Sequence, residues 1–398
     1  MNVELLQEWL RPYANGLREL ALVGDTGGGQ LEVLFRDPFF APLHRLKTPA
    51  KYWEGIRLRD GTTLYGTSSV ENVCIAEELA YGDPGLYLAL PGPNLAGTVV
   101  DKLGTPEQKD AFFQHFLHKT AWSAFALTEP DAGSDAAAIA TTAMPQPDGS
   151  YLLNGAKRYI GNGMSADWYV VFAQTRPSHS KRSASVLTIE SFLFRADECT
   201  TGLIRSYDRT VGLRAARLGR IGFQNLRLTP EHVLGYDKKP LNRGFTGAIA
   251  TFQLMRPATA AMAVGIARAA IEYTEASKRL TPHEEIVLSR LKWEVKRGRL
   301  LAMHAANLCD QGAGKARYYA SMAKCFMNRL VAETTRNCSA MFGSDLRSDH
   351  PFLEKLQRDS WMIEYMEGTS NILTLDVHSG LLANGQLPTT VWTGGNRS

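Results

Sequence analysis

A β-rich block separates two helical regions of this chain, and that order limits the folds it can adopt. Between residues 120 and 232, short runs such as "YLLNGAKRYIGNG", "DWYVVFAQT" and "SASVLTIESFLF" are rich in β-branched and aromatic residues. Gly, Asn, Asp and Pro separate these runs, as expected for turns between strands. The block predicts a small β-barrel or sandwich inserted between helical parts.

Helical periodicity dominates on both sides of this block. In "SVENVCIAEELAYG" apolar residues recur at threes and fours, and "TPEQKDAFFQHFLHK" opens with residues suited to a helix N-terminus. After residue 235 three long helical segments are joined by brief polar loops, which is typical of a helical bundle. The 398 residues exceed what one hydrophobic core usually organises, so we expect several packed units and a mostly α, α+β fold.

Composition excludes several classes of protein. A hydrophobic content of 44% with 21% charged residues is ordinary for a soluble globular chain. The net charge of +4 is too mild to indicate nucleic acid, although it would suit an acidic partner protein or a phosphate-bearing ligand. No apolar run is expected to cross a membrane, and the acidic start "MNVELLQEWLRP" does not resemble a secretory signal, so we expect a cytoplasmic location.

The cysteines predict neither a disulfide framework nor a zinc site. Their number is odd, they are scattered, and no CxxC spacing occurs. We therefore expect free thiols and no metal at Cys74, Cys199, Cys309, Cys325 and Cys338.

One acidic residue near the C-terminus is a candidate base. In "IEYMEGTSNI", Glu367 follows an apolar and aromatic stretch, and Gly368 after it permits a tight turn. Apolar surroundings raise the proton affinity of a carboxylate, as proton abstraction near neutral pH requires. Taken alone, the same segment also fits an exposed glutamate at the start of a helix.

Several ordered segments resemble the acyl-CoA dehydrogenase family. The resemblance begins with "ALTEPDAGSDAAA" and extends to "IAEELAYGDPGLYLAL", "LLNGAKRYIGNG", "FQLMRPATAAMAVGIARAAIEY" and "EKLQRDSWMIEYMEGTSNI". It covers roughly residues 65–380 in the family's order and nearly at its spacing. The resemblance implies an N-terminal helical domain (1–119), a central β-barrel (120–232) and a C-terminal four-helix bundle (233–398).

The resemblance also implies a chemistry. In the family the glutamate that matches Glu367 removes the α-proton of an acyl thioester while flavin N5 accepts the β-hydride. Its own backbone N–H, together with a flavin ribityl hydroxyl, binds the thioester oxygen. Some relatives hold the base on the helix before "RP", where this chain has the non-acidic Gln253, Leu254 and Met255. Glu367 is therefore the predicted catalytic base.

The flavin-binding residues are likewise implied by resemblance. The segment that follows the first strand of the block would run along the cofactor, through Phe125, Leu127, Thr128, Gly133 and Ser134. On a second strand, the family's Trp-Ile-Thr is matched by Tyr159, Ile160 and Gly161. Gly161 lacks the hydroxyl that usually bonds flavin N5, and a backbone N–H could take that role.

The segments for the ADP half of the cofactor depart from the family. Arg279 matches the first arginine of a stretch that contacts this half across a dimer interface, but the phenylalanine and glycine that follow are missing. In "AMFGSDL", Ala340 and Ser344 replace a glutamine and a glycine, whereas Thr369 and Asn371 keep the expected polar character. We expect FAD in a modified adenine pocket, with FMN or weak retention left open.

Substrate contacts are implied at Ser134, Gln253, Arg256 and Gly368. The alternative for Arg256 is an ordinary inter-helix charge. Thr374 and Ser379 stand where some relatives carry arginines near coenzyme A, which motivates the hypothesis that the thioester is held by an acyl carrier protein. Pro91 and Pro93 would interrupt a helix beside the acyl tail.

The expected function is thus FAD-dependent dehydrogenation of an acyl thioester bound to coenzyme A or to a carrier protein. An oxidase of the same fold and a non-catalytic flavoprotein relative are the alternatives. The resemblance further implies a homodimer or homotetramer that passes electrons to an electron-transferring flavoprotein or another acceptor.

Overall fold

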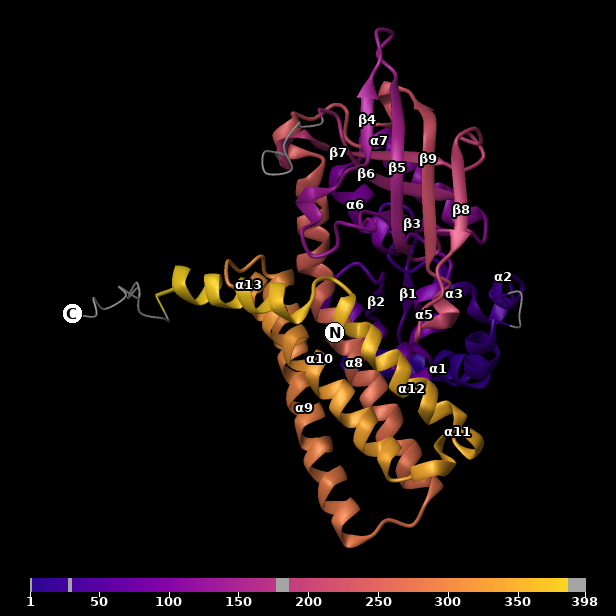
Figure 1. Cartoon of the computed structure of the whole chain (residues 1–398), viewed down its shortest axis with the longest axis vertical. Helices are drawn as coiled ribbons and strands as arrows, with labels where there is room; N and C mark the ends of the chain where they lie inside the picture. Colours follow the sequence, from indigo (N-terminus) through magenta and orange to yellow (C-terminus); the bar gives the residue numbers. More distant parts are fainter. Residues whose placement is uncertain (1, 28–30, 177–185, 386–398) are drawn as a thin grey trace, which may run out of the picture.

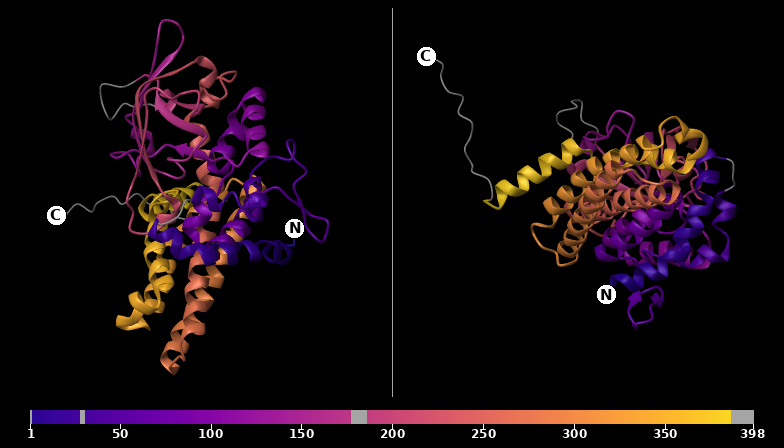
Figure 2. Two further views of the ribbon diagram at one scale, coloured as in Figure 1. Left: turned by 90° about the vertical axis from the view of Figure 1, so that its right-hand side faces the viewer. Right: turned by 90° about the horizontal axis from the view of Figure 1, so that it is seen from below.

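Helices, a sheet and long helices follow one another along the chain, which confirms the predicted mostly α, α+β fold class (Figure 1). The computed structural model describes residues 2–27, 31–176 and 186–385. Residues 183–185 of one predicted strand and residues 386–398 of the predicted bundle region lie outside this description. In Figure 2 the sheet and the ends of the long helices lie at opposite ends of the molecule, with the N-terminal helices between them.

The N-terminal part consists mainly of helices whose starts follow from local chemistry. Two predicted helices begin with capping boxes: the Ser68 hydroxyl accepts from the Glu71 N–H at 3.1 Å, and Thr105 and Gln108 form the equivalent pair. A small two-stranded ribbon interrupts the helices. The elements are α1 (Val3–Thr26), α2 (Leu31–Leu34), α3 (Ala41–His44), β1 (Ile56–Arg57), β2 (Thr63–Leu64), α4 (Ser69–Gly82), α5 (Pro84–Ala89), α6 (Asn94–Leu103) and α7 (Pro106–His118).

The predicted break near Pro91 and Pro93 is present. Helix α5 ends at Ala89 and α6 begins at Asn94, so the two prolines lie between separate helices. Proline cannot donate the hydrogen bond that would continue the first helix.

Among the described residues, seven strands form one curled sheet in the middle of the chain. Their order is β3-β6-β4-β5-β9-β8, and β7 pairs with β6. Alternate residues of β6 enter two different cores: Tyr169 and Val171 pack inside the sheet, and Val170 and Phe172 pack against helices. The strands are β3 (Ser123–Ala126), β4 (Thr142–Pro145), β5 (Tyr151–Ile160), β6 (Trp168–Gln174), β7 (Ile189–Arg195), β8 (Leu203–Tyr207) and β9 (Gly219–Leu228).

Long helices of the C-terminal part pack side by side as a bundle, formed by α8, α9, α10 and α12 (Figure 1). Close approach to the N-terminal part depends on Gly265, because a Cβ there would lie 2.2 Å from the Glu77 carbonyl oxygen of α4. The helices are α8 (Phe245–Ser277), α9 (Pro282–Asp310), α10 (Ala316–Ala340), α11 (Leu346–Asp349), α12 (Pro351–Met362) and α13 (Ser370–Ala383).

Helix α8 corrects one expectation from the sequence. Within the described residues it is long and apolar enough to cross a membrane, contrary to the expectation that no run reaches that length. However, 89% of its most apolar window is buried inside the molecule. A helix that is apolar all round and covered by other helices is typical of a protein core.

Candidate active site

The predicted base lies in the turn that joins α12 to α13, where the bundle meets the sheet (Figure 1). Glu367 has φ 51° and Gly368 has φ 107°, so two successive residues adopt left-handed backbone conformations. This conformation is uncommon for a residue with a side chain and usually persists only where surrounding contacts enforce it. The turn therefore carries a local constraint at the residue that the sequence singles out.

Two buried cations hold the main chain of this turn. Arg256 Nε of α8 donates to the Glu367 carbonyl at 3.1 Å. Lys324 Nζ of α10 donates to the Ile363 carbonyl at 3.2 Å and to the Gly368 carbonyl at 2.9 Å. Because both cations bind carbonyl groups, they fix the turn without occupying the carboxylate of Glu367.

Arg256 is itself fixed by an inter-helix network. Its Nη1 donates to Asp376 Oδ2 at 2.5 Å and to Ser321 Oγ at 2.9 Å, and Arg317 Nη2 donates to Asp376 Oδ1 at 2.6 Å. The side chain of Arg256 is buried. Arg256 thus supports the base from the protein side, and its predicted contact with substrate stays a prediction.

The neighbouring Glu364 has a different task. Its carboxylate accepts from the Ser370 N–H and hydroxyl at 2.6 Å each, and from Asn328 Nδ2 at 2.9 Å. It therefore caps the start of α13, where a negative charge is favourable. Of the two glutamates in the turn, only Glu367 has a carboxylate that remains available.

The electrostatics of Glu367 suit a proton acceptor. Within the described part of the chain its Oε2 atom is shielded from solvent and has no hydrogen-bond partner, and its main-chain N–H donates to no described residue. Burial raises the pKa of Glu367 to about 7, although Lys324, Arg256 and Lys47 oppose that rise. A carboxylate with a pKa near neutral pH can both take and release a proton under ordinary conditions.

The predicted flavin residues of the first strand lie at the junction of sheet and bundle. Phe125 packs against Phe172 of β6 and Phe252 of α8, with ring centroids 5.1 and 6.1 Å away. Leu127 is buried, and its carbonyl accepts from Lys157 Nζ at 3.0 Å, so only its main chain could meet a ligand. The Thr128 carbonyl accepts from the Arg158 N–H at 2.8 Å, which places this loop beside Tyr159.

The second strand offers an aromatic face and open space. Tyr159 is 46% exposed at φ 59°, and the Arg158 guanidinium lies over its ring at 4.6 Å. A Cβ added to Gly161 or Gly133 would meet no heavy atom within 4 Å. Ile160, by contrast, is buried in the sheet core and could contribute only its backbone. The arrangement fits a planar aromatic cofactor beside Tyr159.

Several other residues predicted to contact the cofactor or substrate have polar side chains without a hydrogen-bond partner among the described residues. Within the described residues, the side chains of Ser134, Thr369 and Asn371 make no hydrogen bond, and Ser134 and Asn371 are exposed. Gln253 lies half-buried on α8, where its carbonyl accepts from Cys309 Sγ at 3.6 Å. The cofactor and substrate roles of these four residues stay predictions.

Arg279 lies apart from these residues. It is exposed in the loop between α8 and α9, at the end of the bundle farthest from the sheet (Figure 1). Lys278 Nζ donates to the Met341 carbonyl at 2.8 Å, so this loop adjoins the segment of Ala340 and Ser344. The structure thus brings together the two segments assigned to the ADP half, but not within reach of Glu367 in the same chain.

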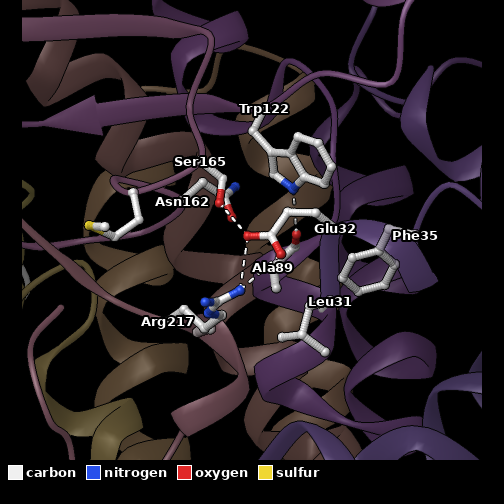
Figure 3. Close-up of a pocket in the computed structure, with 10 residues that line it drawn as sticks. Leu31, Glu32, Phe35, Ala89, Trp122, Asn162, Ser165 and Arg217 are labelled. Carbon is white, nitrogen blue, oxygen red and sulfur yellow. Dashed lines mark hydrogen bonds and ion pairs between the residues drawn. The ribbon is translucent and has the colours of Figure 1, made fainter. Parts of the chain in front are cut away.

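A small cavity near α2 does not compete with this site. It has a volume of about 20 Å³, which is room for roughly one water molecule. Its charged groups satisfy one another: Glu32 accepts from Arg217 Nη1 at 2.9 Å and from the Ser165 hydroxyl at 2.7 Å (Figure 3). In the described chain no group of three His, Cys, Asp or Glu residues could hold a metal ion.

The sequence analysis named Arg256 but missed Lys324, Lys47 and Asp376 around Glu367. A weak signal existed, because Lys324 and Asp376 interrupt otherwise apolar helical stretches. Lys47 gave no such signal, because it lies in an irregular segment far from Glu367 in the sequence.

The chain is similar in sequence to known proteins over most of its length. The sequence models of the acyl-CoA dehydrogenase middle and C-terminal domains match residues 124–226 and 242–382. A probable acyl-CoA dehydrogenase of Mycobacterium tuberculosis is 30% identical over 329 residues, covering 80% of this chain and 81% of that protein. A 3-(aryl)acrylate reductase of Clostridium sporogenes is 31% identical over 333 residues, covering 80% and 85%.

A solved structure shows the same fold. Butyryl-CoA dehydrogenase from Megasphaera elsdenii superposes with a TM-score of 0.79 at 24% identity, covering 95% of this chain and 98% of that one. The coverage of the sequence relatives and the match of both domains lead to one conclusion: this chain belongs to the acyl-CoA dehydrogenase family.

Proposed function

We propose that this protein is an FAD-dependent enzyme that removes hydrogen from the Cα and Cβ atoms of an acyl thioester, with Glu367 as the base. The observation that carries the proposal is the state of Glu367, whose Oε2 and main-chain N–H both lack a partner among the described residues. Leaving a shielded polar atom unpaired lowers stability, so such a residue is usually retained for function.

Each group of Glu367 has a defined task in this proposal. The carboxylate takes the α-proton, and the N–H donates to the thioester oxygen, where negative charge develops as the proton leaves. Arg256 and Lys324 hold the carbonyls of Glu367 and Gly368, which directly follow this N–H, so the donor and the base keep a fixed relation. Fixed donors stabilise developing charge without reorganisation.

The proposed place of the cofactor is at the junction of sheet and bundle. Open space beside Gly133 and Gly161, the exposed ring of Tyr159 and the free hydroxyl of Ser134 are the features that support binding of the isoalloxazine part there. FAD, when bound, supplies an acceptor for the hydride that leaves Cβ. Tyr159 and Phe125 would hold and orient the ring system.

The residues of α13 bear on whether coenzyme A or a carrier protein holds the acyl group. Helix α13 contains neither Lys nor Arg, and Thr374 is exposed with its hydroxyl bonded to the Ser370 carbonyl at 2.8 Å. A helix without cations beside the site has little to offer the phosphates of coenzyme A. We therefore propose that the substrate is a thioester carried by an acyl carrier protein. The test compares turnover of one acyl group on a carrier protein and on coenzyme A. Faster turnover of the coenzyme A thioester would refute the proposed carrier.

The electron acceptor distinguishes dehydrogenase from oxidase. We propose a dehydrogenase that passes electrons to an electron-transferring flavoprotein or a similar acceptor. The purified flavoprotein is reduced by thioester without oxygen, and air is then admitted. Slow return of the yellow absorbance supports the dehydrogenase, whereas fast return identifies an oxidase.

The base is tested by Glu367→Gln, which keeps the shape of the side chain but removes its basicity. We expect turnover to fall by about a hundredfold or more, as for loss of a general base. Flavin content should stay unchanged, because no predicted flavin contact involves the carboxylate. Full activity of this variant would refute the proposal.

A further inference from the structure

One buried carboxylate closes the loop that joins β3 to β4. Glu129 lies near the start of this loop, and its carboxylate accepts from two main-chain N–H groups at the loop's end, those of Ala140 at 2.5 Å and Thr141 at 2.9 Å. The main chain of Glu129 also forms two hydrogen bonds with Ala132, at 3.1 and 3.3 Å, which make a tight turn. Both ends of the loop are therefore fixed to one buried residue.

A lysine of β5 completes this closure. Lys157 Nζ donates to Glu129 Oε1 at 2.7 Å and to the Leu127 carbonyl at 3.0 Å, and its side chain is fully buried. Burial lowers the pKa of Lys157 to about 8. Burial also opposes ionisation of Glu129, but the lysine and the N–H groups hold the pKa of Glu129 below its usual value. Both groups are therefore mainly charged at neutral pH and form a buried ion pair.

The residues after this lysine are the second set of predicted cofactor residues. Arg158 donates its N–H to the Thr128 carbonyl of the loop at 2.8 Å, and Tyr159 and Gly161 follow on the same strand. The lysine and its neighbour thus bind two successive carbonyls of the loop. The two segments predicted to hold the flavin come from different strands, and these bonds fix one against the other.

The tip of the loop differs from its closed base. Within the described residues, the main-chain N–H groups of Gly133 and Ser134 and the Ser134 hydroxyl make no hydrogen bond, and both residues are exposed. Groups that are already held in place lose less freedom when they bind a ligand. A buried ion pair, in contrast, usually contributes no more stability than apolar residues of the same volume. Ligand binding therefore explains this ion pair better than stability does.

We propose that Lys157 and Glu129 are positioning residues, which hold the loop between β3 and β4 against β5 in the arrangement that binds the flavin. They act through main-chain groups and do not touch the cofactor. This inference rests on the proposed function, and it adds the residues that organise the cofactor site before FAD binds.

The test measures FAD binding by Lys157→Met, a change that removes the cation but keeps most of the side-chain length. FAD is removed from the native protein and from the variant, and its rebinding is titrated. We expect the dissociation constant to rise by about ten- to a hundredfold, the range found when a group that supports a metal ligand is removed. The absorbance bands of the bound flavin should shift toward those of free FAD, because the loop no longer gives the ring one fixed environment.

Lys355→Met is the matched control. Lys355 is as fully buried as Lys157 and also has carboxylate partners, Asp83 and Asp359, but none of the three belongs to a predicted cofactor segment. This variant should lose thermal stability without weaker FAD binding. Equal weakening in both variants would show that FAD binding reports stability alone, and it would overturn the inference.

A double variant separates positioning from stability. Lys157→Met leaves Glu129 as a buried charge without its cation, which also lowers stability. Adding Glu129→Gln removes that charge, while the Leu127 carbonyl still has no donor. The double variant should regain part of the lost thermal stability but keep the weakened FAD binding, and it decides the test if Lys157→Met alone does not fold. Native FAD affinity in a folded Lys157→Met protein, or in the double variant, would overturn the inference.

Binding and turnover distinguish this inference from the proposed function. Weakened FAD binding by the variants supports the inference even if the loaded native protein does not oxidise a thioester, in which case only the proposed reaction fails. A native protein that oxidises thioesters while Lys157→Met binds FAD equally well has the proposed function without the positioning pair. A native protein that binds no FAD would overturn both.

Discussion

At the scale of single residues, two glutamates three positions apart show how environment decides function. Glu364 accepts three hydrogen bonds from Ser370 and Asn328, whereas Glu367 keeps an unpartnered oxygen and a raised pKa of about 7. Both belong to one short segment of the sequence. The difference arises because the turn points one carboxylate at the start of α13 and the other at a shielded space.

The pH dependence of activity follows from the raised pKa of Glu367. Because the carboxylate form is the base, kcat/KM should rise as the pH passes through about 7 and fall by about tenfold per unit well below it. Lys47 and Lys324, whose pKa values burial lowers to about 8, and Arg256 are the charges that face this group. The profile should be measured with a methyl-ended thioester, since that substrate does not titrate. A flat profile between pH 5 and 8 would contradict this prediction.

Replacing each of the two glutamates by glutamine should change the free energy of unfolding in opposite directions. A carboxyl group whose pKa is raised on folding destabilises the native state above that pKa, and the penalty disappears as the pH falls toward the ordinary value of 4.5. Glu367→Gln should therefore raise the free energy of unfolding by about 1–3 kcal/mol at pH 8, with the gain fading below pH 7.

Glu364→Gln is the matched control, because it weakens charge-assisted bonds to α13 and should lower stability by about 1–2 kcal/mol. Denaturant titrations of both variants at pH 8 and pH 5 check the contrast. Stabilisation by both changes, or by neither, would contradict it.

At the scale of elements, local signals account for most helices and strands. The helix start at Thr105 and the turn residues between the strands could be recognised directly in the sequence. In contrast, α2 and α3 have four residues each and too little periodicity to be recognised from the sequence. Lys47 lies just after α3, so the same limit explains why its position could not be predicted.

Contact between α4 and α8 should depend on one glycine. Gly265→Ala would place a methyl group against the Glu77 carbonyl oxygen, where overpacking costs about 1–3 kcal/mol or more. Gly314→Ala is the control, since a Cβ there meets nothing within 4 Å, and its effect should stay within about 0.5 kcal/mol. Thermal unfolding of the two variants measures the difference; equal stability would show that the helices can move apart freely.

At the scale of the whole molecule, a buried charge cluster joins three parts of the chain. Lys355 of α12 contacts Asp83 and Asp359 at 2.5 Å each, and Asp359 also accepts from the Leu213 N–H at 2.6 Å. The sequence predicted each part separately, because periodicity reports local structure. It could not predict this cluster, which depends on residues brought together from distant segments.

Removing the cation from this cluster should be costly. Lys355→Met leaves two buried carboxylates without compensation, so we expect a loss of about 3–5 kcal/mol in the free energy of unfolding. Lys292→Met removes an exposed ion pair with Glu275 and should change stability by less than about 1 kcal/mol. Denaturant titration distinguishes the two, and similar small losses would show that the cluster is dispensable.

The distance between Glu367 and Arg279 within one chain leads to a prediction about assembly. If both belong to FAD sites, the site of one chain must be completed by the far end of another chain's bundle, as the resemblance implies. Arg279→Gln should then reduce FAD retention by about tenfold while leaving the fold intact. Arg36→Gln, which changes an exposed arginine of the N-terminal part, is the control.

Dilution of the protein tests independently whether two chains share one FAD site. FAD content and sedimentation are measured together over a range of protein concentrations, because a shared site must lose cofactor as the assembly dissociates. Full FAD retention by a dissociated chain, or by Arg279→Gln at every concentration, would show that each chain binds its cofactor alone. In that event Arg279 and the segment of Ala340 and Ser344 would have no part in the cofactor site, and the adenine pocket would have to lie between the sheet and α13.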